Sequence, residues 1–99
     1  MIEEQQPGEP KISKPITLEE MISTGSKKLA DLIGLKLLAV IGINRQDESD
    51  WSIKLEFIER EGIPNTMDLI GLYEAVYDQN GQLLNYTRLD MRKRGESYT

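Results

Sequence analysis

The chain has 99 residues, with 17 acidic and 12 basic side chains and a formal net charge of -5. A sequence of this length can bury one modest hydrophobic core, so we expect a single domain. It contains neither histidine nor cysteine, which excludes cysteine nucleophiles, disulfides, proton transfer by histidine and zinc sites built from these residues. The acidic charge argues against nucleic-acid binding, because that depends on cationic side chains that neutralise phosphates.

Residues 1–16 have the composition of a flexible N-terminal tail. They contain three prolines among mostly polar residues, so they can bury too little surface to offset the entropy lost on ordering. No secretory signal follows Met1, and the longest apolar run, residues 32–43, is interrupted by Lys36 and is shorter than the roughly 20 residues that span a bilayer. We therefore expect a cytoplasmic protein that does not contact membranes.

A helix is predicted to begin directly after this tail. Thr17 and Glu20 have the spacing of a capping box, and Ile16 is placed to pack on Met21 as a hydrophobic staple. Apolar residues then recur with the 3.6-residue period of a helix, and Gly34 supplies a C-terminal stop.

Gly25 lies inside the apolar stripe of this helix. A glycine in a helix interior costs roughly 1 kcal/mol relative to alanine. It either breaks the helix, with an alternative start near Ser26, or marks a close approach of the helix to a sheet.

Strand patterns follow the helix. Residues 37–45 and 51–59 are predicted to pair as a hairpin around the polar turn 46–50. In the second of these segments polar residues alternate with four apolar ones, which are expected to face the core: Trp51, Ile53, Leu55 and Phe57.

A second hairpin is predicted after a loop at residues 60–66. It joins residues 69–78 to 82–92 through Asn80-Gly81, the pair that best tolerates a type I′ turn. The sequence therefore predicts an α+β fold, with one N-terminal helix packed on a four-stranded antiparallel β-meander. The domain would span residues 17–94, and residues 95–99 would form a C-terminal tail.

One helix cannot cover both faces of a four-stranded sheet, so part of one face is expected to stay exposed. Tyrosine and arginine are enriched at protein contacts, although tyrosines in a sheet are also common as cross-strand pairs with their hydroxyls in water. The candidate partner-binding residues are Tyr73, Tyr77, Tyr86, Arg88 and Arg92.

No catalytic, metal or cofactor site is predicted. Glu56 and Glu59 would lie on opposite faces of a regular strand, which separates them as an acid/base pair. The acidic turn 47–50 lacks the glycine and the terminal glutamate of an EF-hand loop. No glycine-rich phosphate-binding loop occurs, and the hydroxyls at residues 23–26 have no histidine to activate them.

Motifs spread over residues 27–94 occur in the order and spacing of a known family. They are Trp51, Glu56 with Glu59, Ile63-Pro64-Asn65-Thr66 with Asp68, Tyr73-Glu74-Ala75-Val76, Asp78 with Gly81, Tyr86-Thr87-Arg88, and Arg92 with Arg94. Together they resemble the gas vesicle synthesis protein O family (GvpO). The chain departs from the family pattern at Gly62, where the family often has arginine, and at Met91, where it often has tyrosine.

The resemblance implies an accessory protein that is required for gas vesicle assembly and is not an enzyme. Its partners would be other gas vesicle proteins, bound through protein–protein contacts. Self-association through a strand edge at residues 37–43 is compatible with this role. The alternative is a small-ligand-binding or enzymatic domain of cystatin-like fold, which would need a pocket with convergent polar groups between helix and sheet.

Overall fold

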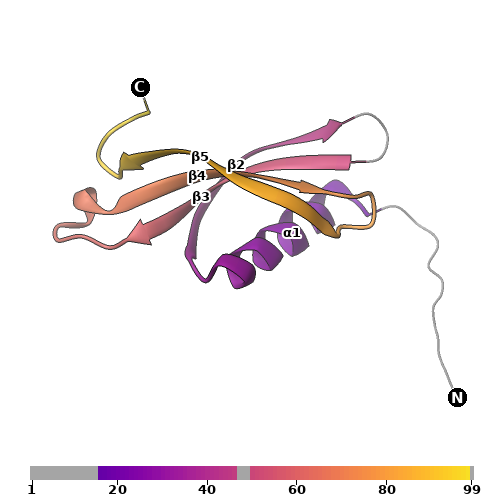
Figure 1. The fold of residues 1–99 in the computed structure, drawn as a ribbon, viewed down its shortest axis with the longest axis horizontal. Helices are drawn as coiled ribbons and strands as arrows, with labels where there is room; N and C mark the ends of the chain where they lie inside the picture. The colour runs from indigo at the N-terminus through magenta and orange to yellow at the C-terminus, as the bar shows by residue number, and fades with distance from the viewer. Residues whose placement is uncertain (1–15, 47–49, 99) are drawn as a thin grey trace, which may run out of the picture.

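The described part of the chain folds as one α-helix followed by a single antiparallel sheet, which confirms the predicted α+β architecture (Figure 1). The computed structural model describes residues 16–46 and 50–98. Its elements are α1 (Leu18–Ile33), β2 (Lys36–Gln46), β3 (Asp50–Arg60), the 3-10 turn η2 (Asn65–Met67), β4 (Leu69–Tyr77) and β5 (Leu83–Lys93). The strand order is β2-β3-β4-β5. The expected tail, apart from residue 16, and the acidic residues 47–49 lie outside the described residues.

Both predicted ends of α1 are confirmed. The Thr17 hydroxyl accepts a hydrogen bond from the Glu20 N–H at 3.2 Å, and the Glu20 carboxylate accepts one from the Thr17 N–H at 3.0 Å. At the other end Gly34 has a φ of 71°, which glycine adopts without strain, and its N–H donates to the Ala30 carbonyl.

The helix is continuous through Gly25, so it does not start near Ser26. Gly25 is buried against the sheet, where a Cβ atom would lie 3.1 Å from Cζ of Tyr77 and 3.2 Å from Cδ1 of Ile53. The Tyr77 hydroxyl donates a 2.6 Å hydrogen bond to the Gly25 carbonyl. Glycine at this position therefore lets the helix backbone approach the sheet closely.

The core lies between α1 and one face of the sheet. The four predicted inward residues of β3 are all buried in it, and the core cluster comprises Met21, Leu29, Trp51, Ile53, Leu55, Phe57, Tyr73, Ala75 and Tyr77. A helix of 16 residues is about 24 Å long, whereas a strand of 11 residues extends about 36 Å. The end of the sheet that carries η2 therefore projects beyond α1 (Figure 1).

The second hairpin turns where predicted, but its turn type differs. The Gly81 N–H donates to the Asp78 carbonyl at 3.0 Å, and Gly81 has a φ of 86°. This is a three-residue loop ending in a left-handed glycine, so the prediction of a two-residue type I′ turn was wrong. The Asp78 carboxylate accepts from the N–H groups of Asn80 and Gln82, both at 2.9 Å, and these bonds stabilise the wider loop.

Candidate interaction site

The two faces of the sheet differ in what covers them. The face that carries the β3 core residues packs against α1 and is termed the helix face. Ser52, Lys54 and Glu56 alternate with those residues and lie on the opposite, open face. The strand register places Leu72 of β4 opposite Glu56, and Asp90 of β5 beyond it.

A glutamate, a tyrosine and an arginine meet on the helix face, in what we term the helix-face cluster. The Tyr73 hydroxyl donates a 2.5 Å hydrogen bond to Oε2 of Glu59, and Nη1 of Arg88 lies 3.6 Å from the same oxygen. Tyr73 also packs edge-on against Phe57, with ring centroids 5.4 Å apart. Burial and the bond to Glu59 raise the pKa of Tyr73 to about 12, with Arg88 opposing them.

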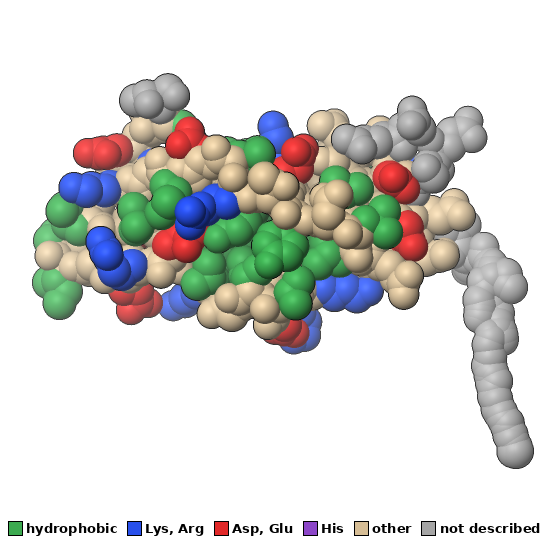
Figure 2. Space-filling view, viewed as in Figure 1, with side chains coloured by type: hydrophobic (Ala, Val, Ile, Leu, Met, Phe, Trp, Pro, Cys, Tyr) green, Lys and Arg blue, Asp and Glu red, His purple; other side chains and the backbone are tan. Residues whose placement is uncertain are grey.

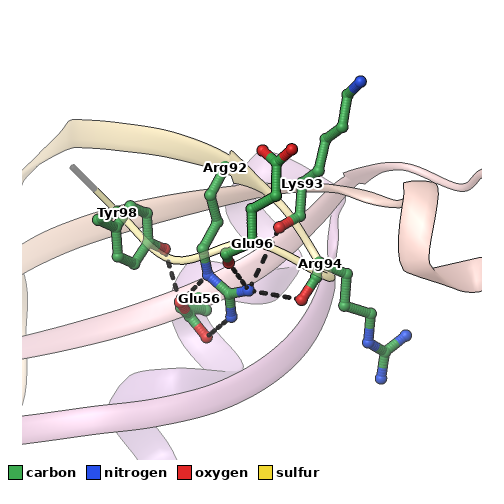
Figure 3. A network of polar contacts seen from close by, with 6 residues as sticks. All are labelled: Glu56, Arg92, Lys93, Arg94, Glu96 and Tyr98. Atoms are coloured by element: carbon green, nitrogen blue, oxygen red, sulfur yellow. Dashed lines mark hydrogen bonds and ion pairs between the residues drawn. The ribbon is translucent and has the colours of Figure 1, made fainter.

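The open face carries a second cluster of the same residue types, the open-face cluster (Figure 3). Arg92 donates two 3.1 Å hydrogen bonds to the Glu56 carboxylate, and the Tyr98 hydroxyl donates a third at 2.5 Å. The Arg92 guanidinium carbon also lies 5.3 Å from the Tyr98 ring centroid. Tyr98 comes from the segment that follows β5, so this cluster attaches that segment to the sheet.

Glu56 is buried, and burial alone would raise its pKa. The hydrogen bonds from Arg92 and Tyr98 and the charge of Arg92 outweigh this effect and hold the pKa of Glu56 below its ordinary value of 4.5. The Arg92 guanidinium also donates to backbone carbonyls of the following segment, at Arg94 (2.8 Å) and Glu96 (2.9 Å). One arginine thus joins β3, β5 and the C-terminal residues.

A third ion pair holds the loop between β3 and β4. Nη1 of Arg94 lies 2.9 Å from Oδ2 of buried Asp68, whose Oδ1 accepts a 2.7 Å hydrogen bond from the Gly62 N–H. The hydrogen bond from the Gly62 N–H has the largest effect on the pKa of Asp68, and Arg94 adds to it. Together they hold this pKa below its ordinary value of 3.8, although burial alone would raise it. The carboxylate therefore closes the loop and ties it to the C-terminal segment.

The five sequence-predicted partner residues do not form one exposed strip. Tyr77 and Tyr73 belong to the core, and Arg92 is engaged with Glu56 on the open face. Tyr86 and Arg88 remain accessible, with a relative exposure of 42% for Tyr86 and of 51% for the Arg88 side chain. They lie two residues apart on β5, opposite Ala75 and Tyr73, so a partner contact by these two stays a prediction.

Two other apolar residues of β5, Leu84 and Leu89, are also exposed and lie close to Tyr86 in sequence. Figure 2 shows hydrophobic side chains gathered across the middle of this view, where β5 passes above α1 in Figure 1. The Tyr86 ring centroid is 6.4 Å from that of Tyr73. Tyr86 therefore continues the buried aromatic packing out to the surface.

Sequence reasoning missed Tyr98, because it assigned residues 95–99 to a tail. The contacts of Gly95 with Thr66 and of Tyr98 with Glu56 hold this segment against the domain. The available signal was an aromatic residue placed shortly after a basic run and a glycine. It carries little information without the position of the buried acceptor, Glu56.

The two glutamates that were considered as an acid/base pair are engaged separately. Glu56 and Glu59 lie on different faces of the sheet, as predicted, and each is paired with a different arginine. Across the described residues, no group of three or more acidic side chains could hold a metal ion. Nor does this part of the chain contain a helix that is long and apolar enough to span a membrane.

Fold and site together define a small α+β domain whose buried charges are paired internally and whose β5 carries exposed aromatic and aliphatic side chains. The family model described as "Gas vesicle synthesis protein GvpO" matches residues 4–98. The chain therefore belongs to the GvpO family of gas vesicle synthesis proteins, which supports a role in gas vesicle formation. No solved structure matches the chain significantly.

Curated relatives agree with this family. The chain is 30% identical over 93 residues to gas vesicle protein O of Streptomyces sp. (strain CB03234), covering 94% of this chain and 69% of that protein. It is 30% identical over 80 residues to gas vesicle protein O1 of Halobacterium salinarum (81% and 66%), and 30% identical over 66 residues to gas vesicle protein O of Haloferax mediterranei (67% and 47%). The chain thus spans between about half and two thirds of these relatives' lengths.

Proposed function

We propose that this domain is a non-enzymatic accessory protein of gas vesicle assembly, which acts in the cytoplasm by binding other gas vesicle proteins. Family membership supports the role in vesicle formation. The proposed contact is supported by the exposed side chains of β5, where Leu84, Tyr86 and Leu89 are exposed on the same strand as Arg88.

β5 stands last in the strand order, and within the described residues it pairs only with β4. A strand with an unpaired edge offers N–H and C=O groups to another chain, and its side chains then select the partner. Aromatic and arginine side chains at such an edge are the types that contribute most to protein contacts. Tyr86 and Arg88 are therefore the residues proposed to contact the partner.

The physical need for such a contact comes from the vesicle itself. A protein shell that encloses gas must present apolar surface toward the gas, and apolar surface exposed before assembly promotes aggregation. A domain with an apolar strand surface can cover part of that surface. Its net charge of -5 would help to keep the complex in solution.

Two experiments test this proposal. The first deletes the gene and scores cells for flotation and for vesicles by electron microscopy; a strain that floats normally without the protein contradicts the role. The second measures binding of purified gas vesicle proteins to the wild-type chain and to Tyr86→Ser. We expect at least tenfold weaker binding of one partner.

The matched control is Leu32→Ser, which removes an exposed leucine from α1. It should bind like wild type. Arg88→Ser is a second variant of the proposed surface, whereas charge reversal at Arg92 is unsuitable because it would place two carboxylates together in the open-face cluster. Equal binding by wild type, Tyr86→Ser and Arg88→Ser would contradict the proposed surface.

A further inference from the structure

The loop between β3 and β4 presents an aliphatic side chain almost entirely to solvent. Ile63 has a relative exposure of 98%, and Met67 on the same loop is also exposed. The loop lies at the end of the sheet that projects beyond α1, where Figure 2 shows hydrophobic side chains beside Lys and Arg side chains at the left of the view. Ile63 therefore contributes almost no burial to the core of this domain.

The loop is nevertheless held by a dense set of polar contacts. Asp68 is buried at its base and accepts from the Gly62 N–H at 2.7 Å and from the Arg94 side chain at 2.9 Å. The Arg94 N–H also donates to the Asp68 carbonyl at 2.8 Å, and the Gly95 N–H donates to the Thr66 carbonyl at 3.0 Å. These bonds fix both ends of the loop to each other and to the C-terminal segment.

The inside of the loop is packed as tightly as its base. A Cβ atom at Gly62 would lie 2.8 Å from the backbone carbon of Met67, a distance that real Cβ atoms essentially never show. The Met67 N–H donates to the Pro64 carbonyl at 2.9 Å, closing the turn. A loop fixed in this way loses little conformational freedom when it binds, so an exposed side chain on it is prepared for contact.

Exposed cations outnumber exposed carboxylates around the loop, although the chain as a whole is acidic. Arg60 ends β3 just before the loop, and Lys93 pairs with Leu69 in the sheet register next to Arg94. These three exposed cations flank the loop, and exposed Lys36 is close enough to act on the charge of Asp68. Arg94 is paired with buried Asp68, and the exposed carboxylates nearby are Glu61 and Glu96. The chain as a whole carries -5. A partner surface with acidic side chains would therefore complement this end of the sheet.

We propose that loop 62–68 is a preformed anchor whose Ile63 side chain inserts into an acid-rimmed apolar pocket of another gas vesicle protein. This inference rests on the proposed function and adds a second contact to it, at the end of the sheet that projects beyond α1. A second copy of this chain carries the same cations around its own loop, so a loop-to-loop contact between two copies is disfavoured. A membrane is disfavoured, because one aliphatic side chain on a closed loop buries far less apolar area than an inserting amphipathic helix.

The test compares Ile63→Ser with Ile41→Ser, which removes an exposed isoleucine from β2. Purified gas vesicle proteins of the same organism are immobilised one at a time, and the dissociation constant of each chain is measured. Burying one isoleucine corresponds to roughly 10- to 100-fold in affinity. We expect Ile63→Ser to lose this factor for one partner while Ile41→Ser and the thermal unfolding temperature stay unchanged, and equal affinity of both variants would overturn the anchor.

Two further measurements test whether Ile63 contacts something other than a gas vesicle protein. If the wild type sediments with phosphatidylglycerol vesicles and Ile63→Ser does not, Ile63 contacts a lipid surface and not a protein pocket. If the wild type forms a concentration-dependent dimer that Ile63→Ser does not form, the partner of Ile63 is a second copy of this chain. Either result overturns the proposal, and a partner contact that weakens when Arg60 and Lys93 are changed to glutamate supports it.

Flotation distinguishes failure of this inference from failure of the proposed function. A deletion strain that still floats, or a wild-type chain that binds no gas vesicle protein, contradicts both. A deletion strain that sinks, and that regains full flotation with Ile63→Ser, contradicts the anchor alone. Loss of flotation with Ile63→Ser at normal protein level, together with full rescue by Ile41→Ser, supports it.

Discussion

The two faces of the sheet carry the same three residue types in different settings. In the helix-face cluster, Glu59 binds Tyr73 and Arg88, and all three residues lie within the sheet. In the open-face cluster, Glu56 binds Arg92 and Tyr98, and the tyrosine lies beyond the last strand. The first cluster extends a packed aromatic core, whereas the second connects a separate segment to an otherwise complete sheet.

Exposure decides how much each ion pair contributes. The Arg88 side chain is 51% exposed and lies 3.6 Å from its carboxylate, so water screens the pair and its contribution is small. The Arg92 side chain is 17% exposed and binds its buried carboxylate with two nitrogens. Removing one member of such a pair leaves an uncompensated charge in the protein. Breaking the ion pair is therefore expected to cost little on the helix face and much more on the open face.

The largest expected effect comes from removing the buried cation. Arg92→Met should lower the free energy of unfolding by about 3 kcal/mol, because it leaves the Glu56 carboxylate buried without its partner. Arg88→Met should change it by less than about 1 kcal/mol. Urea unfolding followed by the fluorescence of Trp51 measures both.

A double variant serves as the control for that comparison. Glu56→Gln combined with Arg92→Met removes both charges and should recover much of the loss, since no isolated charge remains. If Arg92→Met and Arg88→Met were equally destabilising, the exposure of an ion pair would not determine how much its loss costs.

The helix-face cluster can be broken through the backbone. A Cβ atom at Gly71 would overlap the Glu59 carboxylate and lie 2.9 Å from the Tyr73 ring. Gly71→Ala should therefore displace Glu59 and destabilise the domain by about 1 to 3 kcal/mol, measured by thermal unfolding. Gly42→Ala is the matched control, because nothing lies within 4 Å of the added atom on β2. A Gly71→Ala protein as stable as that control would show that Glu59 moves without loss.

Acid should remove the stabilisation that the Glu56 carboxylate gives to the open-face cluster. The pKa of Glu56 is lower in the folded protein than its ordinary value of 4.5, so the unfolded chain binds the proton more readily. The stabilisation is therefore fully present above about pH 4.5 and is lost as the pH falls below it. We expect Glu56→Gln to reduce the slope of unfolding free energy against pH between 5 and 3, and an unchanged slope would contradict this assignment.

The smallest expected effect concerns the tyrosine hydroxyls. Tyr98→Phe should cost about 1 kcal/mol, expressed mainly as faster hydrogen exchange in residues 94–98, because these residues can open without the sheet. Tyr73→Phe removes a hydroxyl from within the sheet and should instead lower the stability of the whole domain. Exchange measured by mass spectrometry distinguishes the two, and uniform acceleration in Tyr98→Phe would contradict separate opening.

The element order and the helix caps could be predicted because their signals are local. Thr17, Glu20 and Gly34 act within one helical turn, and the alternation of apolar and polar residues in β3 records which side is buried. Family membership was predictable from the order of short motifs and is confirmed by the family match over residues 4–98. The turn at Gly81 was placed correctly, but its type depended on the Asp78 side chain.

The candidate site was less predictable, because burial of a tyrosine depends on what lies across the sheet. Tyr73 and Tyr77 lie four residues apart in β4, and Tyr86 lies in β5. The sequence around them does not distinguish a buried tyrosine from an exposed one. Gly25 creates the space that buries Tyr77 and accepts its hydroxyl, and this requires knowing how the helix crosses the sheet. The contact of Tyr98 with Glu56 joins residues 42 positions apart and leaves no periodic pattern.

The meander order also bears on how the protein forms during translation. Each strand pairs with the one made just before it, so the sheet can grow as the polypeptide leaves the ribosome. Glu56 and Asp68 emerge well before Arg92 and Arg94, their partners. Both carboxylates must therefore stay hydrated until those arginines are synthesised, which makes closure of this end of the domain a late event in its biosynthesis.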